Sequence, residues 1–132
     1  MTINLVGPIN SGLAVGGDGV ATANNTSDHI ISGRIIALDI KYNATPPGAT
    51  TDVTIATAGN ASPAVTITTI TDSATAKRYY PRDTVHDKVG ADLTYDDTRL
   101  VSESIPINDN IKITIAGANA DDNADVYLLM EN

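Results

Sequence analysis

Residues 77–97, KRYYPRDTVHDKVGADLTYDD, concentrate the side chains of this chain that could do chemistry. They include three of the five tyrosines and one of the two histidines among 132 residues. The segments on either side look like plain β-strands. A long connection of this kind in a compact domain is usually functional or disordered, and the apolar residues Val85, Val89 and Leu93 argue against disorder. It could be an active-site loop, a metal site or a surface that presses on another protein.

A nucleophilic triad would need a serine or threonine within reach of a histidine, and an acid that orients the imidazole. His86 stands beside Asp87, and Ser102 and Ser104 follow. Adjacent residues on an extended chain point to opposite sides, and no G-x-S-x-G motif holds a serine on a strained turn. We therefore expect His86 to face solvent, and we expect no catalytic residues and no enzyme activity.

Paired carboxylates occur at residues 96–97 and 121–122. Alternate oxygens at Asp121, Asn123 and Asp125 resemble part of a calcium loop, because Ca²⁺ takes six to eight oxygen ligands. The run lacks the glycine at the bend and the bidentate glutamate of an EF-hand. A turn built from Asx residues is the preferred interpretation, and no metal site is predicted.

The glycine-rich residues 12–21, GLAVGGDGVA, lack the lysine of a phosphate-binding P-loop and have no helix to open. Flexibility is enough to explain them. We expect the protein to need no cofactor.

Sixteen acidic and eight basic residues give a formal net charge of −8. A net negative surface repels phosphate, so nucleic acid is not an expected partner. No run of about 20 apolar residues predicts a membrane span. With no basic, apolar leader at the start, we expect the chain to begin at Met1 and to be made in a cytosol. The absence of cysteine excludes disulfides and thiolate chemistry.

Tyrosine and arginine on a connection are the residue types that dominate protein interfaces. An alternative is that this connection folds back, with its tyrosines as lids on the protein's own core, and one loop can do both. A carbohydrate-binding module is a further alternative, weakened by the absence of tryptophan. The residues expected at a protein interface are Ile3, Leu5, Tyr79, Tyr80, Pro81, Arg82, Val85, His86 and Tyr95.

The elements that must position this connection look like short strands. Apolar residues at every second position from Ile36 to Tyr42 predict one strand, and a hairpin is predicted from residues 52–58 and 64–71. The phase slips at Ile70, which indicates a bulge or a strand end. Adjacent prolines make residues 45–51 a loop. Extended segments follow at residues 99–107, 111–117 and 125–131.

These short strands, rich in Thr, Ile and Val, predict an all-β fold of one domain. We expect an antiparallel β-sandwich or barrel, jelly-roll-like, with little or no helix. Residues 1–28 are rich in glycine and asparagine and are expected to form a partly irregular N-terminal arm, with one or two short strands. Residues 29–132 are expected to form the sandwich.

Several short strings are similar to small virion structural proteins of tailed bacteriophages, of the head decoration or cement type. The resemblance covers roughly residues 30–130 and rests on SGRIIA from Ser32, TDVTI from Thr51, YPR from Tyr80, VHD from Val85 and LTYD from Leu93. It implies a protein of the phage head surface that binds the major capsid protein. It also implies self-association, often as a trimer. These strings are not catalytic signatures, so the resemblance implies a shared fold more strongly than a shared function.

Overall fold

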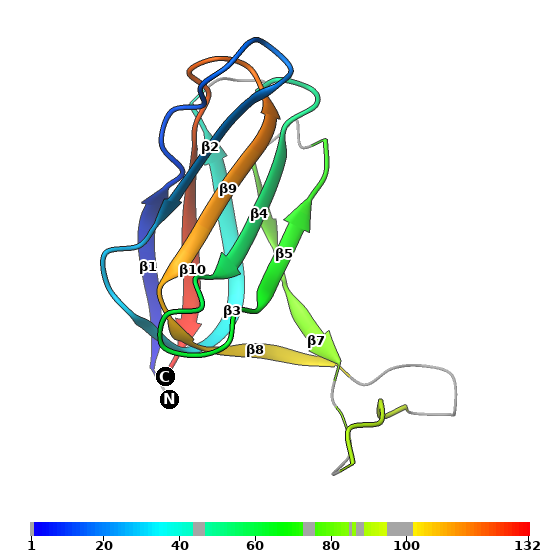
Figure 1. Ribbon diagram of the computed structural model, residues 1–132. Helices are drawn as coiled ribbons and strands as arrows, with labels where there is room; N and C mark the ends of the chain where they lie inside the picture. Colours follow the sequence, from blue (N-terminus) through cyan, green and yellow to red (C-terminus); the bar gives the residue numbers. More distant parts are fainter. Residues whose placement is uncertain (1, 44–46, 73–75, 85, 87–88, 95–101) are drawn as a thin grey trace.

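The protein is a sandwich of two antiparallel sheets (Figure 1), seen in a computed structural model that describes residues 2–43, 47–72, 76–84, 86, 89–94 and 102–132. The prediction of an all-β antiparallel sandwich is confirmed, and the described residues contain no helix. In this part of the chain there is accordingly no helix that could cross a membrane. The strands are β1 (Ile3–Asn10), β2 (Ala21–Thr26), β3 (Ile31–Tyr42), β4 (Asp52–Thr57), β5 (Thr66–Ile70), β6 (Lys77–Tyr79), β7 (Arg82–Thr84), β8 (Ser102–Asp109), β9 (Ile111–Ala118) and β10 (Ala124–Glu131).

The first sheet has the strand order β1-β10-β3-β8-β7, and the short strand β6 also pairs with β3. The second sheet has the order β2-β9-β4-β5. The longest strand, β3, therefore has two partners along one side: β8 pairs with Ile31–Ile35 and β6 pairs with Leu38–Ile40. Ile36 and Ala37 lie between these two partners, and the chain that follows β6 leaves the sandwich beside them.

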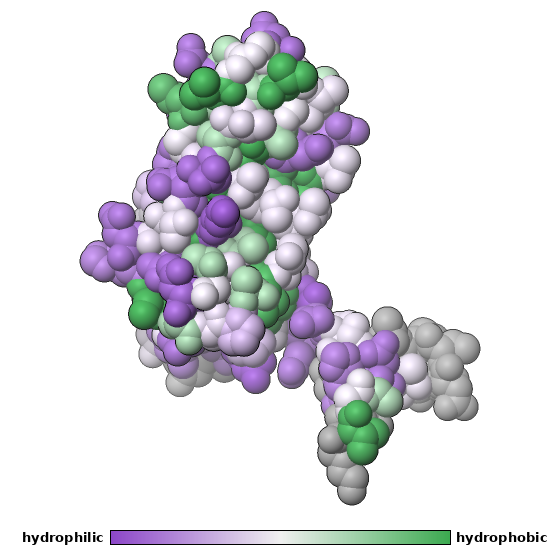
Figure 2. Space-filling model, in the orientation of Figure 1, coloured by the Kyte–Doolittle hydropathy of each residue, from purple (hydrophilic) through white to green (hydrophobic). Residues whose placement is uncertain are grey.

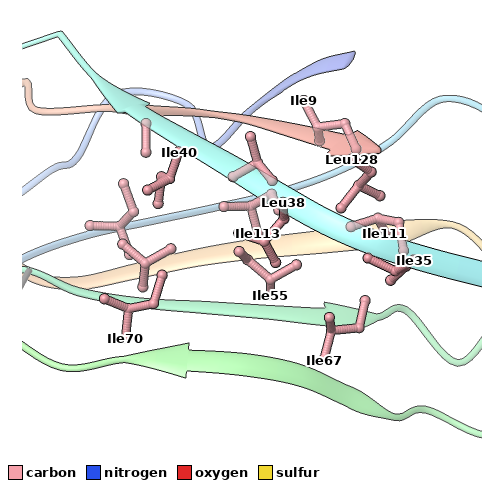
Figure 3. Close-up of a cluster of buried hydrophobic side chains, with 14 of the residues drawn as sticks. Ile9, Ile35, Leu38, Ile40, Ile55, Ile67, Ile70, Ile111, Ile113 and Leu128 are labelled. Carbon is pink, nitrogen blue, oxygen red and sulfur yellow. The ribbon is translucent and has the colours of Figure 1, made fainter. Parts of the chain in front are cut away.

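An aliphatic core lies between the two sheets (Figure 3). Alternation places every second side chain of a strand on the inner face, and β9 and β10 follow this rule closely. Ile113 of β9 and Leu128 of β10 are fully buried. The chain has no Phe or Trp, so isoleucine, valine, leucine and alanine fill the space that aromatic rings occupy in many sandwiches.

The predicted hairpin is confirmed, since β4 and β5 pair with each other. β5 ends at Ile70, so the phase slip there marks a strand end. The irregularity of the ladder lies at the opposite end, near Ile67, where two residues of β5 face one of β4. Residues 47–51 form the loop that their composition predicts, and the remaining residues of the 45–51 segment lie outside the described residues.

Residues 2–28 contain two strands, separated by an irregular loop. β1 pairs with β10 along its length, and β2 pairs with β9, so the two strands belong to different sheets. Ile9 and Ala21 are buried in the core, and Val6 packs against it. Both strands are therefore part of the sandwich, and the burial of Ile9 and Ala21 stabilises the fold.

Candidate protein-interaction surface

A projecting hairpin extends from one edge of the first sheet (Figure 1). The first half of β8 (Ser102–Ser104) pairs with β7, and its second half, from Ile105 to Asp109, pairs with β3. One continuous strand thus runs from the sandwich into the projection. Figure 2 shows this part as a lobe set apart from the body, with hydrophobic surface near its end. We call residues 82–84, 86, 89–94 and 102–104 the projecting hairpin.

Core packing stops where the hairpin begins. Ile105 and Ile107 of β8 are buried, but no described residue between Pro81 and Ile105 is. A two-stranded hairpin without a packed face is marginal in water, because its ladder alone does not offset the chain entropy it loses. The hairpin therefore presents its side chains to solvent on both faces. This geometry suits contact with another molecule.

The base of the projecting hairpin is fixed to β3 by Arg82. The Arg82 guanidinium donates to the backbone oxygen of Ile36 at 3.1 Å and to that of Pro81 at 2.8 Å. Ile36 is the extra residue of a β-bulge against β10, and it lies between the residues of β3 that pair with β8 and those that pair with β6. Arg82 therefore satisfies a carbonyl at the point where the ladder opens.

The neighbouring tyrosines, Tyr79 and Tyr80, have different surroundings. Tyr79 is half-buried, packs against the core and pairs with Leu38. Its side chain thus covers the protein's own core, as in the alternative that the tyrosines act as lids. Tyr80 is 60 % exposed, and the Arg82 guanidinium lies 6.0 Å from the centre of its ring. Sequence reasoning could not separate the two, because they are adjacent in the chain and identical in type.

β6 is held on β3 by a bidentate ion pair. Arg78 Nε and Nη2 lie 2.6 and 2.8 Å from the two carboxylate oxygens of Asp39. The hydrogen bond from Arg78 lowers the pKa of Asp39, and the same contact raises the pKa of Arg78. Both side chains are partly exposed, so solvent screens much of this attraction. The pair aligns β6 on β3 and thereby sets where the next residues leave the sheet.

The tip of the projecting hairpin combines a polar contact with exposed aliphatic side chains. His86 Nε2 lies 2.9 Å from Asp92 Oδ1, and these residues form an isolated β-bridge. Val89 is 80 % exposed and Leu93 is 38 % exposed. Two expected interface residues, Val85 and Tyr95, lie outside the described residues.

The expected interface residues Ile3 and Leu5 lie at the opposite edge of the same sheet. They belong to β1, which is the strand at one end of the first sheet, whereas β7 is at the other end. Their side chains are 56 % and 61 % exposed. The structure therefore places the predicted interface residues on two separate surfaces.

The histidine and the serines considered for a nucleophilic triad all lie in the projecting hairpin. Ser102 and Ser104 pair with β7, and the acid that His86 contacts is Asp92. Among the described residues, no cluster of three or more His, Cys, Asp or Glu side chains could hold a metal ion. Residues 87–88 and 95–101 lie outside the described residues, and these include Asp87 and the carboxylate pair at 96–97.

The acidic run after β9 forms a turn, as preferred over a calcium loop. Asp121 has a positive φ of 65°, a conformation that Asp tolerates in turns. The Asp122 carboxylate accepts from the Gly48 backbone N–H at 3.3 Å, and Asp125 accepts from Asn10 at 2.8 Å. These oxygens join neighbouring segments of the sandwich.

The glycine-rich residues 12–21 are tied to this same turn. The Ala14 N–H donates to the Asp122 carbonyl oxygen, and the Asp121 N–H donates to that of Ala14, both at 2.8 Å. Asp18 accepts from the Ala120 N–H at 3.1 Å. Hydrogen bonds at Ala14 and Asp18 therefore hold this loop to the turn after β9.

Asp109, at the turn between β8 and β9, is a buried carboxylate that sequence reasoning missed. Burial alone would raise its pKa, but hydrogen bonds from the backbone N–H groups of Ala61, Asn110, Gly59 and Ser62 outweigh this and lower it. The carboxylate of Asp109 is therefore favoured in its charged form, and by accepting from several backbone N–H groups it fixes the conformation of the turn after β4. The sequence of the turn, Asn108 to Asn110, did not indicate that the Asp109 carboxylate accepts hydrogen bonds from a loop distant in the chain.

We expect Asp109→Asn to lower the Tm by about 5 °C or more near neutral pH, because an amide cannot accept from this many donors. Since folding lowers the pKa of Asp109, its contribution is complete above the pKa of the unfolded chain, about pH 4. It is lost as pH falls through the lower folded value. Thermal unfolding followed by circular dichroism between pH 7 and pH 3 measures this difference.

The exposed Asp28→Asn provides the matched control, with little expected change in Tm. A difference between Asp109→Asn and the unmodified protein that stays constant down to pH 3 would contradict the assignment.

A groove of about 310 Å³ lies between the second half of β1, the end of β2 and the residues that lead into β3. It is lined by Val6 to Asn10 and by residues 25–29 and 31. Polar side chains there include Asn25, Asp28 and His29.

Comparisons with protein-family models, curated proteins and solved structures returned no match. The fold and its surfaces define an all-β sandwich that carries a projecting hairpin at one edge.

Proposed function

We propose that this chain is a non-enzymatic structural protein of a phage virion. In this proposal it binds the major capsid protein through the projecting hairpin and stabilises the head as a decoration or cement protein. The supporting observation is that the hairpin extends from the sandwich with no buried residue among those described, and with Val89 strongly exposed at its tip. The choice of a phage head as the target rests on the sequence resemblance described above.

The physical properties of the chain suit this role. The base of the hairpin is fixed to the sandwich through Arg82 and β8, so less entropy is lost on binding than with a free peptide. One hairpin offers a small contact, but many copies on a symmetric shell bind many equivalent sites. A net charge of −8 favours solubility while the copies accumulate.

A second candidate function is ligand binding, for example of a carbohydrate by a tail or fibre module. The groove between β1 and β2 favours it, because its volume of about 310 Å³ falls at the lower end for small-molecule sites and polar side chains line it. A glycan array on the purified chain separates the two functions. Head attachment through the hairpin predicts no saccharide response.

The head-attachment proposal is tested by mixing the purified chain with head shells of the phage that encodes it and sedimenting the shells. We expect the unmodified chain to co-sediment, and Val89→Asp to lower occupancy about tenfold at limiting concentration. The reason is that a carboxylate at the tip would have to lose its hydration in the contact. Circular dichroism should show the same fold, because Val89 is outside the core.

The matched control is Val15→Asp, which adds the same charge at an exposed position in the loop between β1 and β2. Normal occupancy by Val89→Asp would contradict the hairpin as the contact. No co-sedimentation of the unmodified chain would contradict attachment to the head.

A further inference from the structure

The outer edge of β1 carries unused backbone hydrogen-bonding groups. Thr2 and Asn132 exchange two backbone hydrogen bonds, of 3.2 and 2.9 Å, which fixes the alternation of the ladder with β10. Asn4 and Val6 are paired with β10 in the same phase, opposite Met130 and Leu128. The N–H and C=O groups of Ile3 and Leu5 therefore point away from β10. In the described part of the chain, β10 is the single strand that pairs with β1.

This edge lacks the protection that exposed edges usually have. Charged side chains normally discourage pairing with another chain, but residues 2–10 have no formal charge. Ile3 and Leu5 also expose more than half of their surface. In a chain with a net charge of −8, β1 is an edge at which two copies can meet without opposing carboxylates on the paired strands.

We propose that β1 pairs antiparallel with β1 of a second copy of this chain, around a two-fold axis at Asn4. In this register Ile3 lies opposite the partner's Leu5, and Leu5 lies opposite the partner's Ile3. The outward N–H and C=O groups of both residues are then satisfied, and the two first sheets join into one. A two-fold contact of this kind uses the same surface on both copies.

The side chains support this register. Leu5 already lies beside Leu129 of β10 on the outer face of the sheet. Pairing extends this into a row of Leu129, Leu5 and the partner's Ile3, with neighbouring strands about 4.8 Å apart. The two-fold axis creates the row twice. Aliphatic pairs across strands stabilise a sheet more than alanine pairs do.

The second half of β1 limits the pairing. The ladder with β10 shifts between Val6 and Ile9, and Pro8 has no N–H to donate. Residues 27–29 line the groove beside this half of the strand. Pairing is therefore confined to Thr2–Val6, and a register centred on Asn4 uses that span fully.

This interface does not depend on the proposed function, because β1 and the projecting hairpin lie at opposite ends of the strand order. It also differs from the trimer that the sequence resemblance implies, since it closes after two copies.

Sedimentation velocity of the purified full chain over a range of concentrations tests the proposal. We expect a monomer–dimer equilibrium, weakened about tenfold by Leu5→Lys, because two lysines would stand beside the two-fold axis and an aliphatic pair would be lost. Val20→Lys, at an exposed position in the loop before β2 and outside the paired span Thr2–Val6, changes the net charge equally and should leave the equilibrium unchanged. A chain that stays monomeric, forms a trimer, or responds equally to both variants would overturn the proposal.

Cysteine cross-linking tests the register, since the chain has no cysteine of its own. Asn4 and the partner's Asn4 form a non-hydrogen-bonded pair with Cα atoms about 4.5 Å apart, which a disulfide can bridge. Asn4→Cys should therefore oxidise to a covalent dimer. In Thr2→Cys the two Cα atoms are about 13 Å apart along the strands, so it should remain uncross-linked. Equal cross-linking of the two variants would overturn the register.

Discussion

Replacement of Ile113 by alanine is expected to lower the free energy of unfolding by about 4 kcal/mol. Ile113 is fully buried on β9, where it pairs with Ile55 of β4 and Asn25 of β2. Figure 3 shows it among Leu38, Ile55 and other aliphatic side chains of both sheets. The substitution removes three carbons and leaves a cavity that strands fixed on both sides cannot close. Urea denaturation followed by circular dichroism measures the loss.

The exposed residue Ile30 provides the control, because it lies outside the core and Ile30→Ala makes the same chemical change. We expect that variant to change the free energy of unfolding by less than about 1 kcal/mol. Equal effects of the two substitutions would contradict the position of the core between β9 and β3. A domain of this size has about 5–15 kcal/mol of stability in total, so Ile113→Ala removes a large share.

Replacement of Gly117 by alanine is expected to cost about 3 kcal/mol. Gly117 has a positive φ of 62°, and a Cβ there would collide with the backbone oxygen of Thr50. The hydroxyl of Thr50 in turn donates to the Gly117 carbonyl oxygen at 2.7 Å. Backbone on both sides of this contact cannot yield as a flexible side chain would, so β9 and the loop before β4 must separate. Thermal and urea denaturation measure the cost.

Gly12→Ala separates the two contributions to that cost. Gly12 also has a positive φ, of 79°, but no atom lies within 4 Å of where its Cβ would stand. We expect about 1 kcal/mol from the backbone conformation alone. If Gly117→Ala costs no more than Gly12→Ala, the close contact with Thr50 is not the reason for a glycine at 117.

The two proposed surfaces have compatible positions. The projecting hairpin leaves the β7 end of the first sheet, and β1 is at the other end. A chain that binds a protein shell through its hairpin would keep β1 available to another copy. The two tests are independent, because sedimentation of the free chain reports on β1 and co-sedimentation with shells reports on the hairpin.

The local sequence determined the strands and the inner face of most of them. Alternation of Ile111, Ile113 and Ile115 is enough to predict both a strand and its buried side, since period two directly encodes which residues face the core. The double proline before Gly48 likewise determined a loop. Residues 2–10 were harder, because a glycine, a proline and exposed apolar side chains obscure the pattern of a strand whose stability comes from β10.

Tertiary structure alone decided which residues meet. From the sequence, Tyr79 and Tyr80 are equal candidates for an interface. The pairing of β6 with β3 places Tyr79 against the core and leaves Tyr80 exposed to solvent. Arg82 looked like an interface residue, and its hydrogen bond to Ile36 exists because two strands share one side of β3. Asp109 gave no local signal, since all but one of the donors named above come from a loop about fifty residues away. Alternation along a strand is a local property, whereas partners across a sheet depend on the path of the whole chain.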